Sequence, residues 1–155
     1  MIAVVQRCRR GAVRVAGEEV GALGAAGGLV VLLGVEVGDG AREAKRMADK
    51  LAKLRIFEDD TGRMNRSVAE AGGGVLVISQ FTLAGDTRGG NRPSFTQAAR
   101  PEAAEPLVAQ VVEEIRATGL AVATGRFRTE MEVDLVNDGP VTLIVRIEPP
   151  QADAG

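Results

Sequence analysis

Two uninterrupted apolar runs, at residues 29–35 and 75–78, constrain the fold of this chain most strongly. A strand that is buried on one face alternates apolar and polar residues, whereas a strand that is buried on both faces is apolar throughout. Both runs are shorter than ordinary helices. They therefore predict two strands of a sheet that is covered on both faces.

Two longer segments have the periodicity of helices that lie on a sheet. In residues 41–54 the apolar positions recur three or four apart and form one stripe, with Asp39 as the expected N-cap. Residues 101–118 carry a second apolar stripe that ends at Gly119. The two prolines of this segment fit only the first turns of a helix.

Short β-branched segments near the N-terminus predict further strands joined by tight turns. These segments, separated by Gly11 and by Ala16-Gly17, are residues 4–8, 12–15 and 19–23.

At the other end of the chain, residues 131–136 alternate apolar and polar side chains and residues 141–147 are largely apolar. Residues 137–140, Asn-Asp-Gly-Pro, lie between them, so we expect two neighbouring antiparallel strands. Strand-rich ends around two helices predict an α+β fold, an antiparallel, barrel-like curved β-sheet with two principal covering helices. A doubly wound parallel sheet fits this order less well.

Length and composition predict a single domain over residues 1–148, followed by a disordered tail at residues 149–155. The chain has 155 residues and 45% of them are apolar, enough for a sizeable core. No apolar run reaches membrane-spanning length and the N-terminus has no secretion signal, so we expect a cytoplasmic protein.

The charges exclude some function classes. A formal net charge of −2 argues against a protein that coats nucleic acid through its overall charge, but leaves room for a local basic site. Lysine occurs only at Lys45, Lys50 and Lys53, and all other positive side chains are arginine. One cysteine and no histidine leave little to hold a metal ion, so we expect no metal and no cofactor.

Two peptides with hydroxyl side chains lie at the ends of predicted strands and suggest an esterase. Ser79-Gln80-Phe81-Thr82 follows one apolar run, and residues 137–142 separate two strands. The Ser or Thr nucleophile of an esterase is usually activated by a histidine. Because this chain has none, a hydrolase built on these peptides must work differently. Taken alone, each peptide is also typical of an ordinary turn.

Six motifs, distributed over nearly the whole chain, resemble those of one family. They are VVQR at residues 4–7, LRIF at 54–57, SQFTL at 79–83, NRPSF at 91–95, GRF at 125–127 and VNDGPVT at 136–142. In order and spacing they are similar to the D-aminoacyl-tRNA deacylases, also called D-tyrosyl-tRNA deacylases. The resemblance runs from residue 1 to about residue 147.

The resemblance implies a substrate and an assembly. The substrate is the ester that joins a D-amino acid, or glycine mischarged on tRNA for alanine, to the terminal adenosine of tRNA. The assembly is a homodimer in which the Gly-Pro peptide of one subunit, in the cis form, enters the Ser-Gln-Phe-Thr pocket of the other. The expected partners are therefore D-aminoacyl-tRNA, glycyl-tRNA and a second copy of the chain.

The resemblance also assigns roles to matching residues. The reacting ester is expected to lie against Ser79, Gln80, Phe81 and Thr82. The filter that distinguishes enantiomers consists of Gly139 and Pro140. Arg7 matches the residue that braces the Gly-Pro loop, and Asn137 is expected to support it.

Arginines near these motifs are candidate contacts for tRNA phosphates, with an ordinary charged loop as the alternative. The cationic cluster consists of Arg88, Arg92, Arg100, Arg126 and Arg128, and we assign this role to Arg88, Arg92 and Arg126.

The expected filter has a simple physical basis. A cis X-Pro bond turns two successive carbonyl oxygens to the same side, where they can accept hydrogen bonds from the α-ammonium group of the substrate. With that group and the ester carbon both held, an L-side chain would collide with Gly139-Pro140 and a D-side chain would point into open space. Glycine has no side chain to reject, so glycyl-tRNA should be hydrolysed as well.

The missing histidine fits a mechanism in which the substrate assists its own hydrolysis. The ribose hydroxyl next to the ester can help to transfer protons, and the backbone N–H groups near Phe81 and Thr82 can stabilise the oxyanion. Thr82 as a nucleophile is the alternative. A catalytically silent, dimeric module that binds the tRNA end, and a hydrolase of small D-amino acid esters, also remain open.

Two pairs of residues depart from the family pattern. Ala84-Gly85 and Arg128-Thr129 stand where other residues are common in the family, and both pairs are expected to flank the pocket. They leave the reaction class unchanged but affect the expected shape of the pocket.

Overall fold

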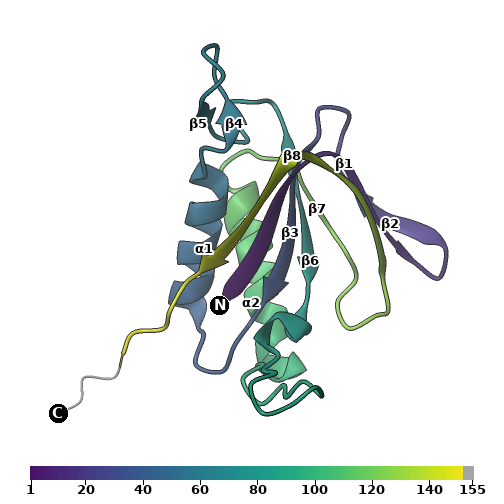
Figure 1. The fold of residues 1–155 in the computed structure, drawn as a ribbon, viewed down its shortest axis with the longest axis vertical. Coiled ribbons are helices and arrows are strands. Elements are labelled where there is room, and N and C mark those ends of the chain that lie inside the picture. Colours follow the sequence, from purple (N-terminus) through teal and green to yellow (C-terminus); the bar gives the residue numbers. More distant parts are fainter. Residues whose placement is uncertain (152–155) are drawn as a thin grey trace.

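The computed structural model describes residues 1–151, and its main feature is a six-stranded sheet that curves into a nearly closed barrel (Figure 1). The order of the sheet is β2 (Glu18–Ala22), β1 (Ile2–Val15), β3 (Gly28–Gly34), β6 (Gly74–Ser79) and β7 (Val122–Thr124), with β8 (Glu132–Arg146) paired to β1. A separate small hairpin consists of β4 (Phe57–Glu58) and β5 (Met64–Arg66).

The central strands β3 and β6 are buried on both faces, as their apolar sequences predict. In β3, Leu29, Val31 and Leu33 belong to the larger core, whereas Val30 and Leu32 belong to a second core on the opposite face. Strand β6 alternates in the same way between the two cores. Both faces of these strands therefore need apolar residues.

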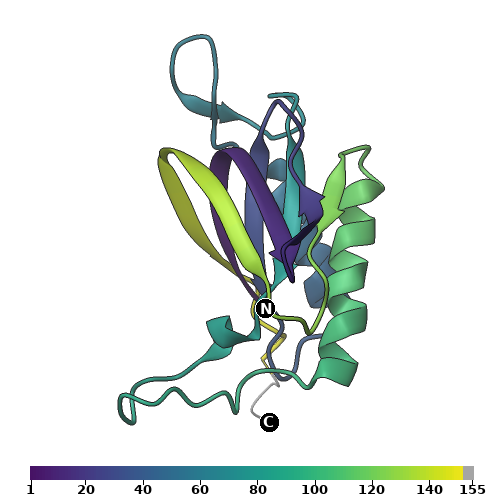
Figure 2. The same cartoon turned by 90° about the vertical axis from the view of Figure 1, so that its right-hand side faces the viewer.

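Two helices cover one face of the sheet (Figure 2). They are α1 (Ala41–Lys53) and α2 (Pro101–Arg116), which confirms both predicted helices with slightly earlier ends. Their buried side chains complete the larger core and are Ala44, Met47, Ala48 and Leu51 of α1 and Ala104, Val111, Val112 and Ile115 of α2.

The predicted N-cap of α1 is wrong, because Gly40 occupies that position. The carboxylate of Asp39 instead accepts hydrogen bonds from the amino group of Met1 and from the backbone N–H of Glu36, each at 2.7 Å. The N–H of Gly40 donates to the carboxylate of Glu43 at 2.9 Å. Asp39 thus ties the start of the helix to the start of β1.

The prediction of an antiparallel sheet is wrong in part, because the sheet is mixed. Strand β3 pairs with β6 in parallel, and β6 pairs with β7 in parallel. Each of these connections passes through a helix, which returns the chain to the same end of the sheet and makes the next strand parallel. The pairings of β1 with β2, β3 and β8 are antiparallel.

The two strands expected on either side of residues 137–140 are one strand, β8. Both halves of β8 pair with β1, and the register moves from Gln6 opposite Thr142 to Cys8 opposite Asn137. Five positions of β8 therefore span two positions of β1, so residues 138–141 form a bulge and not a hairpin turn. Turn-like composition alone does not distinguish these two structures.

Strand β1 is likewise continuous through Gly11, where the sequence predicts a turn. A Cβ atom at Gly11 would lie 2.6 Å from Cγ2 of Val30, so the glycine allows close packing of β1 over β3. In residues 1–151 no helix is long and apolar enough to cross a membrane. Of the predicted tail, residues 149–151 have no regular secondary structure and residues 152–155 lie outside the described residues.

The start of the β3–β6 pair gives a test of the fold. A Cβ atom at Gly28 would collide with the carbonyl oxygen of Gly74, and its φ of +147° is one that L side chains rarely adopt. Gly28→Ala should therefore lower the free energy of unfolding by roughly 3 kcal/mol, measured by chemical denaturation. At Gly24 an added Cβ has no atom within 4 Å, and Gly24→Ala is the matched control. Equal stability of the two variants would contradict this account.

Candidate active site

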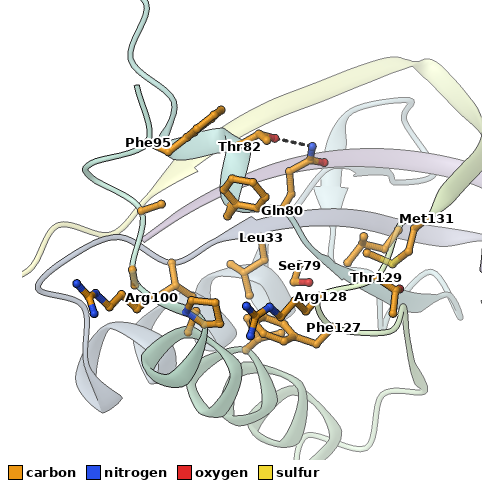
Figure 3. A pocket seen from close by; sticks show the side chains of 18 of the residues that line it. Leu33, Ser79, Gln80, Thr82, Phe95, Arg100, Phe127, Arg128, Thr129 and Met131 are labelled. Carbon is orange, nitrogen blue, oxygen red and sulfur yellow. Dashed lines mark hydrogen bonds between the residues drawn. The ribbon is translucent and has the colours of Figure 1, made fainter. Parts of the chain in front are cut away.

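A cavity of about 840 Å³ opens beside the C-terminal ends of β3 and β6 (Figure 3). Its walls come from these strand ends, from the 3-10 helix η1 (Phe81–Ala84), from the first half of α2 and from residues 127–133. Because β3 and β6 are parallel, both bring their last side chains to the same edge of the sheet. The mixed topology thus determines where the cavity lies.

The four predicted ester-contacting residues, Ser79, Gln80, Phe81 and Thr82, all line this cavity. The backbone N–H of Gln80 donates a hydrogen bond to the carbonyl oxygen of Leu33 at 2.7 Å, and this fixes the chain as it leaves β6. The chain then turns into η1, whose first internal hydrogen bond runs from Leu83 N–H to Gln80. The peptide is therefore held by backbone contacts to β3.

The first turn of η1 leaves backbone donors available. The N–H groups of Phe81 and Thr82 precede the first internal hydrogen bond of the helix, and neither has an acceptor among residues 1–151. Both residues are exposed at the cavity, and the side chain of Phe81 is 60% exposed. Two adjacent N–H donors of this kind can bind a developing oxyanion.

The hydroxyl group of Thr82 is engaged by its neighbour. The side-chain amide of Gln80 donates a hydrogen bond to Oγ1 of Thr82 at 2.8 Å (Figure 3). An amide donor does not remove a proton from a hydroxyl group, so this contact positions Thr82 without activating it as a nucleophile.

Aromatic and aliphatic side chains make most of the cavity wall. Phe81 and Phe95 pack edge to face, with ring centroids 5.2 Å apart. Phe127 and Met131 line the opposite part of the cavity. Sequence reasoning did not name Phe95, Phe127 or Met131 as site residues, although the first two lie within family motifs, which is the signal that could have identified them.

Three charged side chains line the cavity: Arg100, Arg128 and Glu130. Neither arginine forms a salt bridge with any residue in the described part of the chain. Arg128 has a φ of +60°, which few residues other than glycine adopt. Of the two departures from the family pattern, Arg128 and Thr129 line the cavity, whereas Ala84 and Gly85 do not.

The predicted tRNA contacts lie outside the cavity wall. Arg88, Arg92 and Arg126 are exposed, and none of them lines the cavity. Arg88 is paired with Asp86 at 2.7 Å, and this guanidinium group lowers the pKa of the Asp86 carboxyl to about 2. The charge of Arg88 is therefore partly neutralised.

Gly139 and Pro140 occupy the exposed bulge of β8, and the peptide bond between them is cis. Arg7, which is buried, donates to the carbonyl oxygen of Asp138 at 3.2 Å and to that of Ile56 at 2.7 Å. Arg7 thus links the chain next to the bulge to the segment between α1 and β4.

Asn137 supports the other side of the bulge. Its side-chain oxygen accepts a hydrogen bond from the N–H of Val141 at 3.0 Å, and its amide donates to Thr142 at 2.8 Å. Gly139 and Pro140 do not line the cavity of their own chain.

Other reactive groups lie away from the cavity. Cys8 is buried in β1, and burial raises the pKa of its thiol. Within residues 1–151 no group of three or more His, Cys, Asp or Glu side chains is placed to hold a metal ion.

Comparison with known proteins gives the family of the chain. A family model described as D-Tyr-tRNA(Tyr) deacylase matches residues 4–146. A D-aminoacyl-tRNA deacylase of Heliobacterium modesticaldum is 59% identical over 145 residues, covering 94% of this chain and 95% of that protein. One from Paracidovorax citrulli is 55% identical over 150 residues, covering 97% and 96%.

A solved structure has the same fold. It is described as the c-Myc DNA Unwinding Element Binding Protein and superposes with a TM-score of 0.88, at 38% identity over 96% of this chain and 99% of that chain. The family match spans most of the chain, from β1 to the end of β8. The chain therefore belongs to the D-Tyr-tRNA(Tyr) deacylase family.

Proposed function

We propose that this protein hydrolyses the ester bond of D-aminoacyl-tRNA, and of glycine mischarged on tRNA for alanine, to free amino acid and tRNA. The observation that carries the proposal is that the N–H groups of Phe81 and Thr82, at the edge of an apolar cavity, have no acceptor among residues 1–151, in a chain without histidine. Such a role places the protein in the cytoplasm, where aminoacyl-tRNA is used.

In the proposed reaction, water attacks the ester carbonyl carbon and the two N–H groups stabilise the resulting oxyanion. The bond between the carbonyl carbon and the ribose oxygen then breaks, and that oxygen leaves with a proton. The neighbouring ribose hydroxyl accepts a proton from the water and returns one to the leaving oxygen, so the protein supplies position and hydrogen bonds. No side-chain base is required in this scheme.

The filter for enantiomers is proposed to come from a second copy of the chain. Gly139 and Pro140 are exposed and lie outside the cavity of their own chain, so they can act on the substrate only from a partner subunit. Their carbonyl oxygens would accept hydrogen bonds from the substrate α-ammonium group, and their main-chain atoms would exclude an L-side chain.

Exposed apolar side chains on β8 support a dimer. Ile144 is 68% exposed, and Leu143 and Val133 are exposed on the same strand. The second edge of β8 has no partner strand among residues 1–151, because β8 pairs only with β1. An unpaired strand edge that carries apolar side chains is a common surface for association with another copy.

The substrate range gives the first test of the proposal. The rate constant kcat/KM should be at least about 100-fold higher for D-tyrosyl-tRNA than for L-tyrosyl-tRNA, equivalent to about 2.7 kcal/mol of discrimination. Glycyl-tRNA should be hydrolysed at a rate close to that of the D-substrate. A D-substrate whose terminal adenosine lacks the 2′-hydroxyl group should react at least tenfold more slowly.

These rates can be measured by release of radiolabelled amino acid, with spontaneous hydrolysis subtracted. Equal rates for the two enantiomers would rule out the filter. Binding of the charged tRNA without hydrolysis of any substrate would favour the catalytically silent module instead.

Substitutions separate a backbone mechanism from a side-chain nucleophile. A Cβ atom at Gly139 would lie 2.8 Å from Cγ2 of Val141 and 3.2 Å from Arg7, and its φ is +129°. Gly139→Val should distort the loop and lower kcat/KM for D-tyrosyl-tRNA at least 100-fold. Thr82→Ala removes the hydroxyl contact with Gln80 and one methyl group but leaves the backbone N–H, so it should retain activity within about tenfold. If Thr82→Ala bound tRNA normally but hydrolysed no substrate, the Thr82 hydroxyl group would be the nucleophile.

The proposed dimer can be tested at Ile144. Ile144→Lys places a charge on an exposed apolar surface, so it should shift the protein from dimer to monomer in sedimentation at micromolar concentration. Deacylase activity should fall with the dimer, because each cavity would lose the partner's filter. Val37→Lys, at an exposed apolar residue outside β8, is the control. A fully active monomer would disprove the shared site.

A further inference from the structure

A second, basic hollow lies on α1, away from the cavity. It has a volume of about 450 Å³ and is lined by four cations, Arg46, Lys50, Lys53 and Arg55, together with one acid, Asp49, and two apolar residues, Leu54 and Ile147. The charge of this surface contrasts with the net charge of −2 of the whole chain.

The cations of α1 form a stripe along one side of the helix. Arg42, Arg46, Lys50 and Lys53 are spaced by three or four residues, so their side chains lie above one another on the surface. All four are exposed, and they extend over about 16 Å at 1.5 Å per residue. We call these four residues and Arg55 the basic stripe.

The cations of the basic stripe have no salt-bridge partner in the described part of the chain. None of its five members forms a salt bridge with a residue in the range 1–151, and Arg46 contacts only the backbone carbonyl oxygen of Glu148, at 3.4 Å. Lys45, which lies on the same helix but outside the stripe, is paired with Glu114 of α2. Lys45 therefore has an acidic partner on α2, whereas the stripe faces away from such partners among the described residues.

The stripe ends close to the Gly139-Pro140 bulge. Arg55 directly precedes Ile56, whose carbonyl oxygen accepts the hydrogen bond from Arg7 at 2.7 Å. Arg7 also holds the carbonyl oxygen of Asp138, next to Gly139. In the proposed dimer this bulge enters the partner's cavity. The Arg55 end of the stripe would then lie beside the 3′ end of the tRNA that is bound there.

We propose that the basic stripe binds the phosphate backbone of the acceptor arm of the tRNA whose 3′ end occupies the partner's cavity. The inference rests on tRNA as the substrate, as proposed above. A helix face of about 16 Å spans several phosphates of one strand, and cations spaced along it match a backbone that carries one charge at each step. The hollow is lined by no aromatic side chain on which a base could stack, so the contact is independent of sequence.

The test compares two triple variants that lose the same charge. Arg46→Gln, Lys50→Gln and Lys53→Gln together remove three of the five positive charges of the stripe. Arg14→Gln, Lys45→Gln and Arg116→Gln together remove three cations that lie outside the stripe and serve as the control. Each protein is assayed on D-tyrosyl-tRNA and on D-tyrosyl-adenosine, which has the same ester but no phosphate backbone.

With D-tyrosyl-tRNA, the stripe variant should lose at least about tenfold in kcat/KM, mainly through a higher KM, whereas the control should change by less than about threefold. The slope of log(kcat/KM) against log salt concentration should become shallower by about two to three, since three phosphate contacts are removed. With D-tyrosyl-adenosine, both variants should match the unsubstituted protein, which also shows that they are folded.

The proposal would be overturned if both variants lost kcat/KM for D-tyrosyl-tRNA to the same extent. It would also be overturned if the stripe variant lost as much kcat/KM for D-tyrosyl-adenosine as for D-tyrosyl-tRNA. An unchanged salt slope in the stripe variant would do so as well. Failure of the deacylase mechanism is distinguishable, because it would appear in the unsubstituted protein as a lack of stereoselective hydrolysis of D-tyrosyl-adenosine.

Discussion

The burial of β3 and β6 on both faces is the constraint on which the rest of the structure depends. One face packs against α1 and α2 in the larger core, and the other belongs to the second core, to which β1, β2 and β8 contribute. Because the two central strands run in parallel, their C-terminal ends meet at one edge, and Leu33 and Ser79 both reach the cavity there. The same pairing therefore organises the two cores and positions the candidate active site.

A site placed in this way can rely on backbone groups. The N–H groups of Phe81 and Thr82 are oriented by η1, which is held in turn by the bond between Gln80 and Leu33. Backbone donors carry no conformational freedom of their own once the strand and helix are formed, so they would need no rearrangement to bind the proposed oxyanion. An aminoacyl ester has a neighbouring hydroxyl group and needs little further chemistry from side chains, which is consistent with a chain without histidine.

Local sequence patterns predicted the elements better than their connections. The apolar runs of β3 and β6 and the stripes of α1 and α2 were predicted correctly, because burial on one or two faces leaves a direct periodic signal. The parallel pairing was not, since strand direction depends on where the helical connections pass. Residues 137–140 were predicted as a turn, because Asn, Asp, Gly and Pro favour turns and bulges alike, and only the partner strand distinguishes the two.

The candidate site shows the same division. The peptide from Ser79 to Thr82 lies in a family motif and lines the cavity, whereas Ala104, Val108 and Glu130 reach it only through the helix and loop that fold over the strand ends. Five arginines were grouped by charge density along the sequence: Arg88, Arg92, Arg100, Arg126 and Arg128. Arg100 and Arg128 line the cavity and the other three do not, because proximity in the chain does not determine the direction of a loop side chain.

The close approach of Gly28 to Gly74 has a consequence for strand register. A strand that is apolar on both faces gains little from one register over the next, because a slip of one residue exchanges one set of aliphatic side chains for another. Polarity therefore does not fix the alignment of β3 with β6. The glycines at its ends can, since Gly28 fits only against the backbone of Gly74, and Gly34 lies against Gln80 and Leu83 at the other end. Glycines at the two ends of β3 thus determine how this apolar strand aligns with its neighbour.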